Sequence, residues 1–94
     1  MPPFHILREA KKMENLESTI NLMTSDDYKA RFIAEYKQTV IRFTKLKAML
    51  DKWDAGTLEF LPICPRGVYN LQIRAMADYI AVLEARAAIE GIAL

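Results

Sequence analysis

The sequence predicts an all-α protein in which a short N-terminal helix is followed by two long antiparallel helices. Two observations carry this prediction. Apolar residues recur at steps of three or four over residues 26–54 and again over residues 68–91, which is the spacing of a helix with one buried face. The segment between them contains Pro62 and Pro65, which are incompatible with a helix interior. We expect a single helical domain over residues 1–94, with helices over about 6–23, 26–54 and 68–91.

The first helix is predicted from apolar residues that recur at helical spacing up to Met23. It follows an extended start, because Pro2 and Pro3 disfavour helix before them. Thr24 or Ser25 is expected to accept a hydrogen bond from the free amides of the next helix. Asp26 and Asp27 favour the positive end of that helix.

The second helix has a strongly uneven charge. Its expected buried stripe is Phe32, Tyr36, Val40, Phe43, Leu46, Leu50 and Trp53. Between residues 28 and 47 there are six basic residues and one acidic residue, a net charge of +5, whereas the whole chain has a net charge of +1. Gly56 is the expected left-handed residue after the helix end. This basic helix suggests that something anionic is held nearby.

The connector over residues 57–67 is too apolar for a solvated loop, so we expect it to pack over the helix ends. Two long helices joined by a compact loop are expected to be antiparallel.

The third helix has apolar residues on two faces. One expected stripe is Tyr69, Ile73, Met76, Ile80, Leu83 and Ala87, and a second apolar surface is Leu71, Ala75, Tyr79, Val82 and Ile89. A helix that is apolar over most of its circumference is buried on most sides, which a small three-helix monomer cannot achieve. We therefore expect a helical bundle assembled as a homo-oligomer. The alternative is a surface that binds another protein.

Composition and length exclude several classes of protein. The near-neutral net charge excludes a histone-like polyanion binder, so no DNA or RNA polymer is expected as a partner. Cys64 is the only cysteine and cannot form an internal disulfide. No apolar run is long enough to span a bilayer, and the N-terminus does not have the pattern of a signal peptide. These features predict a soluble cytoplasmic protein.

Residues suited to catalysis are scarce. His5 is the only histidine, no glycine-rich phosphate loop is present, and Cys64 has no histidine beside it in the sequence. We expect no enzyme, no metal site and no cofactor.

Residues suited to binding are more numerous. Tyr28, Phe32 and Tyr36 share a helix face, with cations such as Arg31 nearby. Rings stack on bases and cations hold phosphates, so this combination suits a nucleotide. The alternative is that the rings face a core and the cations face water, and spacing alone favours this alternative. Arg74 is a second candidate anion contact, with a surface arginine as its alternative.

The sequence resembles a family of small phage proteins, the anti-CBASS sponges, over roughly residues 26–87. The resemblance lies in the order and spacing of a tyrosine-bearing helix, a Lys-Leu pair, a loop, and a Gln-x-x-Ala-Met-x-x-Tyr helix that ends Leu-Glu-x-Arg. In this chain the matching residues are Asp27-Tyr28, Arg31, Glu35-Tyr36, Arg42, Lys45-Leu46, Met49-Leu50, Leu71-Gln72, Ala75-Met76, Tyr79 and Leu83-Glu84-Ala85-Arg86.

The resemblance implies a helical homohexamer that binds the cyclic di- and trinucleotide messengers of bacterial defence and holds them without degrading them. It places cyclic dinucleotides such as cGAMP between protomers, with an aromatic residue against the base and a lysine near the phosphate. Cyclic trinucleotides use a distinct pocket, and the protein acts in the cytoplasm of the infected bacterium. The ligand-binding residues that it implies here are Tyr28, Arg31, Tyr36, Lys45 and Arg74. A structural or adaptor helical bundle that mediates protein contacts is the alternative function.

Overall fold

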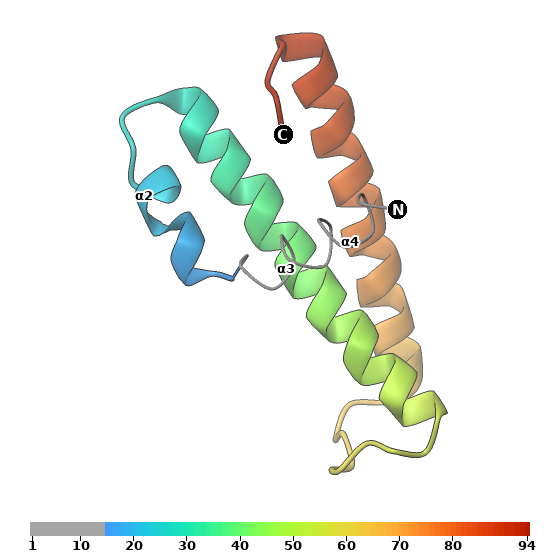
Figure 1. Ribbon diagram of the computed structural model, residues 1–94. Coiled ribbons are helices and arrows are strands. Elements are labelled where there is room, and N and C mark those ends of the chain that lie inside the picture. Colours follow the sequence, from blue (N-terminus) through green and yellow to red (C-terminus); the bar gives the residue numbers. More distant parts are fainter. Residues whose placement is uncertain (1–14) are drawn as a thin grey trace, which may run out of the picture. The chain divides into compact units, whose positions relative to one another are not determined.

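The computed structural model describes residues 15–94, and every regular element in that range is helical. In chain order these are η1 (Glu17–Thr19), α2 (Ile20–Met23), α3 (Tyr28–Asp54) and α4 (Arg66–Glu90), shown in Figure 1. The predicted all-α class, with a short helix before two long ones, is confirmed. The part of the predicted first helix that precedes residue 15 lies outside the described residues.

The chain divides into two compact units. The first unit ends at Ile41, and the second comprises Arg42–Leu94. The organisation of residues 1–94 as a single domain stays a prediction.

The start of α3 is capped by a residue other than the two that the sequence suggested. The carboxylate Oδ1 of Asp27 accepts a hydrogen bond from the amide of Lys29 at 3.1 Å, so Asp27 caps the helix. Ser25 Oγ accepts from the amide of Asp27 at 3.0 Å, before the helix begins. Thr24 Oγ1 donates instead to a carbonyl of α2. The helix starts at Tyr28, two residues later than predicted, because the charged carboxylate just before it is the stronger acceptor for its free amides.

The first unit contains a buried face of α3 that the sequence analysis missed. Ala34 and Ile41 are buried, and Gln38 lies between them at steps of four and three. Gln38 Nε2 donates to Thr19 Oγ1 at 2.9 Å, and Thr19 is fully buried. This hydrogen bond joins η1 to α3. The polar residue in the middle of the stripe hid it from a search for apolar periodicity.

The predicted main stripe of α3 is confirmed. Phe32 and Leu50 are buried, and the other members are half-buried. The helix ends at Asp54 as predicted, and Gly56 has the expected positive φ of 74°. The amide of Thr57 donates a hydrogen bond to the carbonyl of Lys52 at 2.9 Å. The amide of Gly56 donates to the carbonyl of Trp53 at 3.1 Å. This pair of bonds is the Schellman arrangement, which satisfies carbonyls at the helix end.

Helix α4 begins at Arg66, two residues earlier than predicted. Pro65 precedes it in an extended conformation (φ −61°, ψ 147°), which suits the residue before the first helical turn. Gly91 follows its end with a φ of 72°. Within the second unit, α4 runs antiparallel to the C-terminal part of α3 (Figure 1), as predicted.

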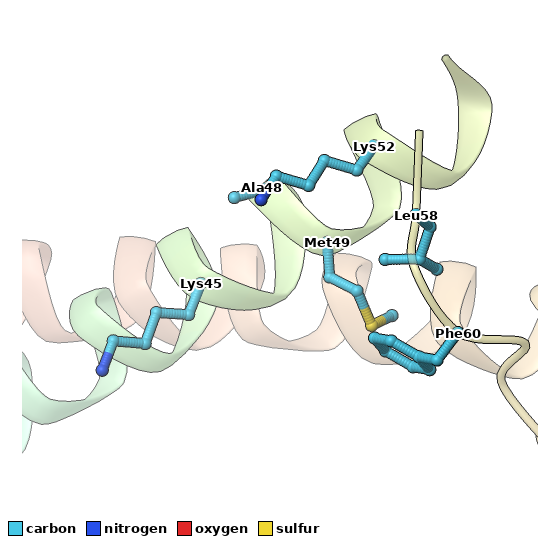
Figure 2. Close-up of a pocket in the computed structure, with 6 residues that line it drawn as sticks. All are labelled: Lys45, Ala48, Met49, Lys52, Leu58 and Phe60. Carbon is cyan, nitrogen blue, oxygen red and sulfur yellow. The ribbon is translucent and has the colours of Figure 1, made fainter. Parts of the chain in front are cut away.

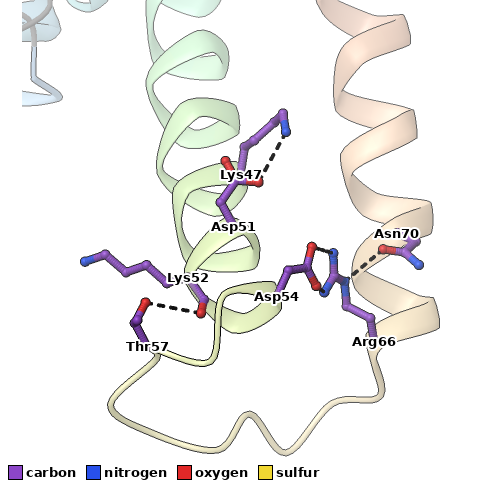
Figure 3. Close-up of polar contacts among 7 residues, drawn as sticks. All are labelled: Lys47, Asp51, Lys52, Asp54, Thr57, Arg66 and Asn70. Carbon is purple, nitrogen blue, oxygen red and sulfur yellow. Dashed lines mark hydrogen bonds and ion pairs between the residues drawn. The ribbon is translucent and has the colours of Figure 1, made fainter.

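The connector between α3 and α4 corrects another prediction. Leu61 and Ile63 have exposed fractions of 84% and 101%, so they do not pack over the helix ends, and Phe60 is 58% exposed. Leu58 is half-buried. Figure 3 shows the connector running beyond the ends of both helices. The positive φ at Gly56 and the fixed φ of the prolines set its backbone path, so apolar character alone does not fold it back onto the helices.

Candidate ligand-binding site

A hollow of ≈ 260 Å³ lies between the last turns of α3 and the connector. Its lining residues are Lys45, Ala48, Met49, Lys52, Leu58 and Phe60 (Figure 2). The first four occupy positions i, i+3, i+4 and i+7 along α3, so they share one face of the helix. Leu58 and Phe60 come from the connector that follows the Gly56 turn.

The floor of the hollow is apolar and includes an aromatic ring. Figure 2 shows the thioether of Met49 lying against the ring of Phe60, with Leu58 beside them. Sulfur–aromatic contacts of this kind are favourable and tolerate small adjustments of the methionine. The hollow therefore has a soft apolar wall that a flat organic group can contact.

The rim of the hollow is positively charged. Lys45 and Lys52 both line it, and no acidic residue of the described range does. Within residues 15–94, neither ammonium group forms an ion pair. A second hollow of ≈ 190 Å³ shares Lys52, Leu58 and Phe60 with the first, but Glu59 lines it too. The first hollow is thus the one whose charge suits an anion.

The base of the connector is held by polar and aromatic contacts. The guanidinium of Arg66 binds the carboxylate of Asp54 through two nitrogens, with Nη2 3.1 Å from Oδ2 (Figure 3). Arg66 Nε donates to Asn70 Oδ1 at 3.0 Å. The same guanidinium lies 5.4 Å from the ring centroid of Trp53, which meets Tyr69 edge to face at 6.0 Å. These contacts join the end of α3 to the start of α4.

This ion pair shifts the ionisation of both partners. The hydrogen bond from Arg66 lowers the pKa of Asp54 below its ordinary value of 3.8, and the same bond raises the pKa of Arg66. The connector base therefore stays fully charged at neutral pH. The sequence analysis missed this pair, although an acidic helix end before Gly56 and a basic helix start after Pro65 were signals for it.

Three of the predicted site residues lie in the first unit. Tyr28 is exposed, with its ring centroid 6.3 Å from that of Phe32 and tilted by 58°. Tyr36 is half-buried. Arg31 is exposed, and its Nη1 donates to the carbonyl of Ser25 at 2.9 Å, so part of its hydrogen-bonding capacity tethers the turn before α3.

The other two predicted residues lie in the second unit and are not neighbours in the hollow. Lys45 lines it, whereas the exposed Arg74 lines neither hollow. The structure instead combines Lys45 with Lys52, Met49 and Phe60, which the sequence analysis did not single out for binding. The signal for Lys52 was its position seven residues after Lys45, two turns along the same face.

The described residues contain no group of three His, Cys, Asp or Glu side chains that could hold a metal ion. His5 lies outside them. None of the helices in residues 15–94 is both long enough and apolar enough to cross a membrane.

Comparison with protein families identifies a match over most of the chain. The Sequestin family matches residues 26–89, which takes in all of α3 and nearly all of α4. No curated protein and no solved structure matches the chain. The matched range agrees with the span of the resemblance to the anti-CBASS sponges and includes the basic helix, the connector with its hollow and the second long helix. The chain belongs to the Sequestin family.

Proposed function

We propose that this protein binds cyclic oligonucleotide messengers and sequesters them without cleaving them, so that a phage evades CBASS immunity in the cytoplasm of its host. Cyclic dinucleotides such as cGAMP are the first expected ligands, and cyclic trinucleotides are the second. The family, whose name denotes sequestration, supports the general activity. The observation that carries the ligand class is the hollow with an apolar, aromatic floor that is also lined by Lys45 and Lys52, which form no ion pair within residues 15–94.

The chemistry of these messengers matches that hollow. A cyclic dinucleotide carries two phosphate charges and two flat bases. Lysine ammonium groups attract phosphates as point charges, and an aromatic ring accepts any base by stacking. Lys45 and Phe60 supply one group of each kind within a single unit of the chain.

Sequestration requires binding alone. A protein that removes a messenger by mass action must be abundant and must bind tightly, but it needs no nucleophile, general base or metal. The scarcity of such groups in the sequence agrees with capture rather than turnover.

The remaining candidate residues fit a ligand shared between copies of the chain. Tyr28, Arg31, Tyr36 and Arg74 do not line the hollow. In the proposed homohexamer, residues of one protomer complete the site of another, as closed symmetric assemblies commonly allow. The exposed apolar residues of α4, which include Val68, Val82 and Ile89, supply a surface for such assembly.

A structural or adaptor protein is the second candidate function, and the same exposed apolar residues of α4 favour it. Such surfaces bind other proteins as readily as further copies of the same chain. An adaptor has no requirement for a hollow lined by Lys45, Lys52 and Phe60.

Isothermal titration calorimetry with 3′,3′-cyclic GMP–AMP and with a cyclic trinucleotide separates the two candidates. Sequestration predicts saturable heat at micromolar protein, and recovery of the intact ligand after the protein is denatured. Absence of heat with every cyclic nucleotide tested would favour the adaptor, and recovery of a linear product would show an enzyme.

A further inference from the structure

We propose that the hollow bounded by Lys45, Lys52 and Phe60 binds one nucleotide unit, with the base against Phe60 and Met49 and the phosphate between the two lysines. This inference rests on the proposed function for the identity of the complete ligand. The chemistry of the subsite is argued from the hollow alone.

The ring of Phe60 is exposed and available for stacking. More than half of this residue is exposed, although a phenylalanine is among the residues that gain most from burial. Its ring contacts Met49 in Figure 2, and it lines both hollows of this region. A base that stacks there would cover the ring without any change in the fold.

Lys45 and Lys52 are the two cations that line the hollow. Lys45 and Lys52 are seven residues apart, which places their Cα atoms about 10 Å apart along the helix axis. Figure 2 shows the side chain of Lys52 running back along α3 toward Ala48, whereas the side chain of Lys45 extends away from Phe60, so Lys45 reaches a shared phosphate by a change of rotamer. Ala48 is the smallest residue of the lining, so the surface between the two lysines stays low and open. A phosphate held there would neutralise two cations that otherwise repel each other.

The size of the hollow limits what it can bind. Its volume of ≈ 260 Å³ is below the range of about 300–1,000 Å³ that encloses most drug-sized ligands. A complete cyclic dinucleotide therefore exceeds it, whereas one base with its phosphate is of suitable size. The rest of such a ligand must contact other surfaces, which agrees with a messenger shared between protomers.

The connector that carries Phe60 is closed at its base by an ion pair. Phe60 is midway between Asp54 and Arg66, the residues whose ion pair closes the connector. The Gly56 turn and two prolines restrict the backbone on either side of it. Less conformational freedom is then lost on binding, so a ring at the tip of a closed loop contributes more to affinity.

Charge selects between the two hollows that share Phe60. Glu59 and Lys52 both line the smaller one, so its charges nearly cancel and its carboxylate repels a phosphate. The larger one has two cations and no acid. The nucleotide unit is therefore placed on the Lys45 side of the ring.

Methionine methyl NMR on the full chain tests the subsite with three small probes. Titration with 5′-AMP is expected to shift the Met49 methyl signal, identified by its loss in Met49→Leu, because a stacked base changes the ring-current field there. Adenosine lacks the phosphate and inorganic phosphate lacks the base, so each alone is expected to shift the signal far less at equal concentration. Equal shifts with all three probes would overturn the subsite.

Three variants change the lining and two matched controls do not. Phe60→Ala and Lys52→Gln remove the ring and one cation, and Ala48→Leu fills the space between the lysines. Each is expected to weaken binding of AMP and of a cyclic dinucleotide by about tenfold or more, from the loss of stacking or of a charge contact. Leu61→Ala and Lys47→Gln alter exposed neighbours outside the lining and are expected to leave both affinities within about twofold.

The failures of the two proposals are distinguishable. If the cyclic dinucleotide binds the wild-type chain and the three lining variants equally, the subsite is overturned and the proposed function stands. If no cyclic nucleotide binds, but AMP shifts Met49 in the wild type and not in the lining variants, the subsite stands and the proposed function falls. If neither ligand binds, both proposals fail.

Discussion

Helices α3 and α4 have similar lengths, 27 and 25 residues, but differ in how much of their apolar surface is covered. On α3, the main stripe and the stripe around Gln38 are buried or half-buried, and the rest of the helix is largely polar and basic. On α4, the stripe that contains Tyr69 and Ile73 becomes buried toward the C-terminus at Leu83 and Ala87, whereas the second apolar surface is exposed. The large exposed apolar residues of α4 are Val68, Leu71, Tyr79, Val82 and Ile89.

The exposed stripe of α4 has the regularity of a packing surface. Val68, Ala75, Val82 and Ile89 recur every seven residues, which is the repeat of a coiled-coil seam. Contiguous exposed apolar surface of this kind marks interaction sites more often than it is tolerated in a monomer. The comparison teaches that α3 is satisfied within one copy, while α4 has an apolar face that remains to be covered. This favours the proposed self-association.

The largest effect is expected at the buried side of α4. Leu83→Ala removes a fully buried side chain, and we expect the free energy of unfolding to fall by about 2–5 kcal/mol, through lost burial and the cavity left behind. Urea denaturation followed by circular dichroism measures this loss. The loss should be the same at every protein concentration tested. A change below that range would mean that the two faces of α4 are less different than their exposure indicates.

The neighbouring residue tests the exposed side with the same kind of truncation. Val82→Ala is expected to leave the fold intact but to weaken self-association by about 1–2 kcal/mol for each contact it makes with another copy, because apolar area at the interface is lost. Sedimentation velocity over a dilution series measures this shift. The exposed Ala81→Ser is the matched control and should shift the association less. Identical association of wild type and Val82→Ala would place this stripe outside the interface.

Much of this difference between the helices was predictable from the sequence. The apolar stripes of both helices, the Gly56 turn and the second apolar surface of α4 follow from spacing and residue type. The helix starts were each displaced by two residues, because the capping position depends on which of several nearby polar or proline residues is used.

The candidate site was predictable only in part. Lys45 was identified, but Lys52 and Phe60 were not, since their proximity to Lys45 depends on the path of the connector. That path follows from the Gly56 turn and from the Asp54–Arg66 pair, which joins residues twelve apart. The connector was expected to be covered because it is apolar, and spacing rules do not state whether a loop folds back or extends. Whether the connector folds back or extends decides whether Phe60 lines the hollow, and so it matters for the proposed function.

A smaller effect is expected at the second buried stripe of α3. Gln38→Ala removes the donor to the fully buried Thr19 and leaves that oxygen with one partner fewer, so we expect a loss of about 1 kcal/mol in the free energy of unfolding. Thermal denaturation of the two proteins at one concentration measures it. Thr39→Ala is the matched control, because its hydroxyl only donates back to the carbonyl of Glu35 within α3. If the control lost as much stability as Gln38→Ala, the bond to Thr19 would not explain the difference.

The smallest effect is expected where α3 and α4 are joined by charge rather than by apolar packing. The folded chain lowers the pKa of Asp54, through the hydrogen bond from Arg66, below the ordinary value of 3.8 that it has when unfolded. The contribution of this pair to stability is therefore fully present above pH 3.8 and is lost as the pH falls through the lower folded pKa. Both groups are at the surface, so salt is expected to weaken the pair. Trp53 is the only tryptophan and stacks on Arg66, so its emission should change in that acidic range in the wild type, and the change should be absent in Asp54→Asn. A transition of equal size in both proteins would show that the acid response comes from elsewhere in the chain, and that the connector base does not depend on this ion pair.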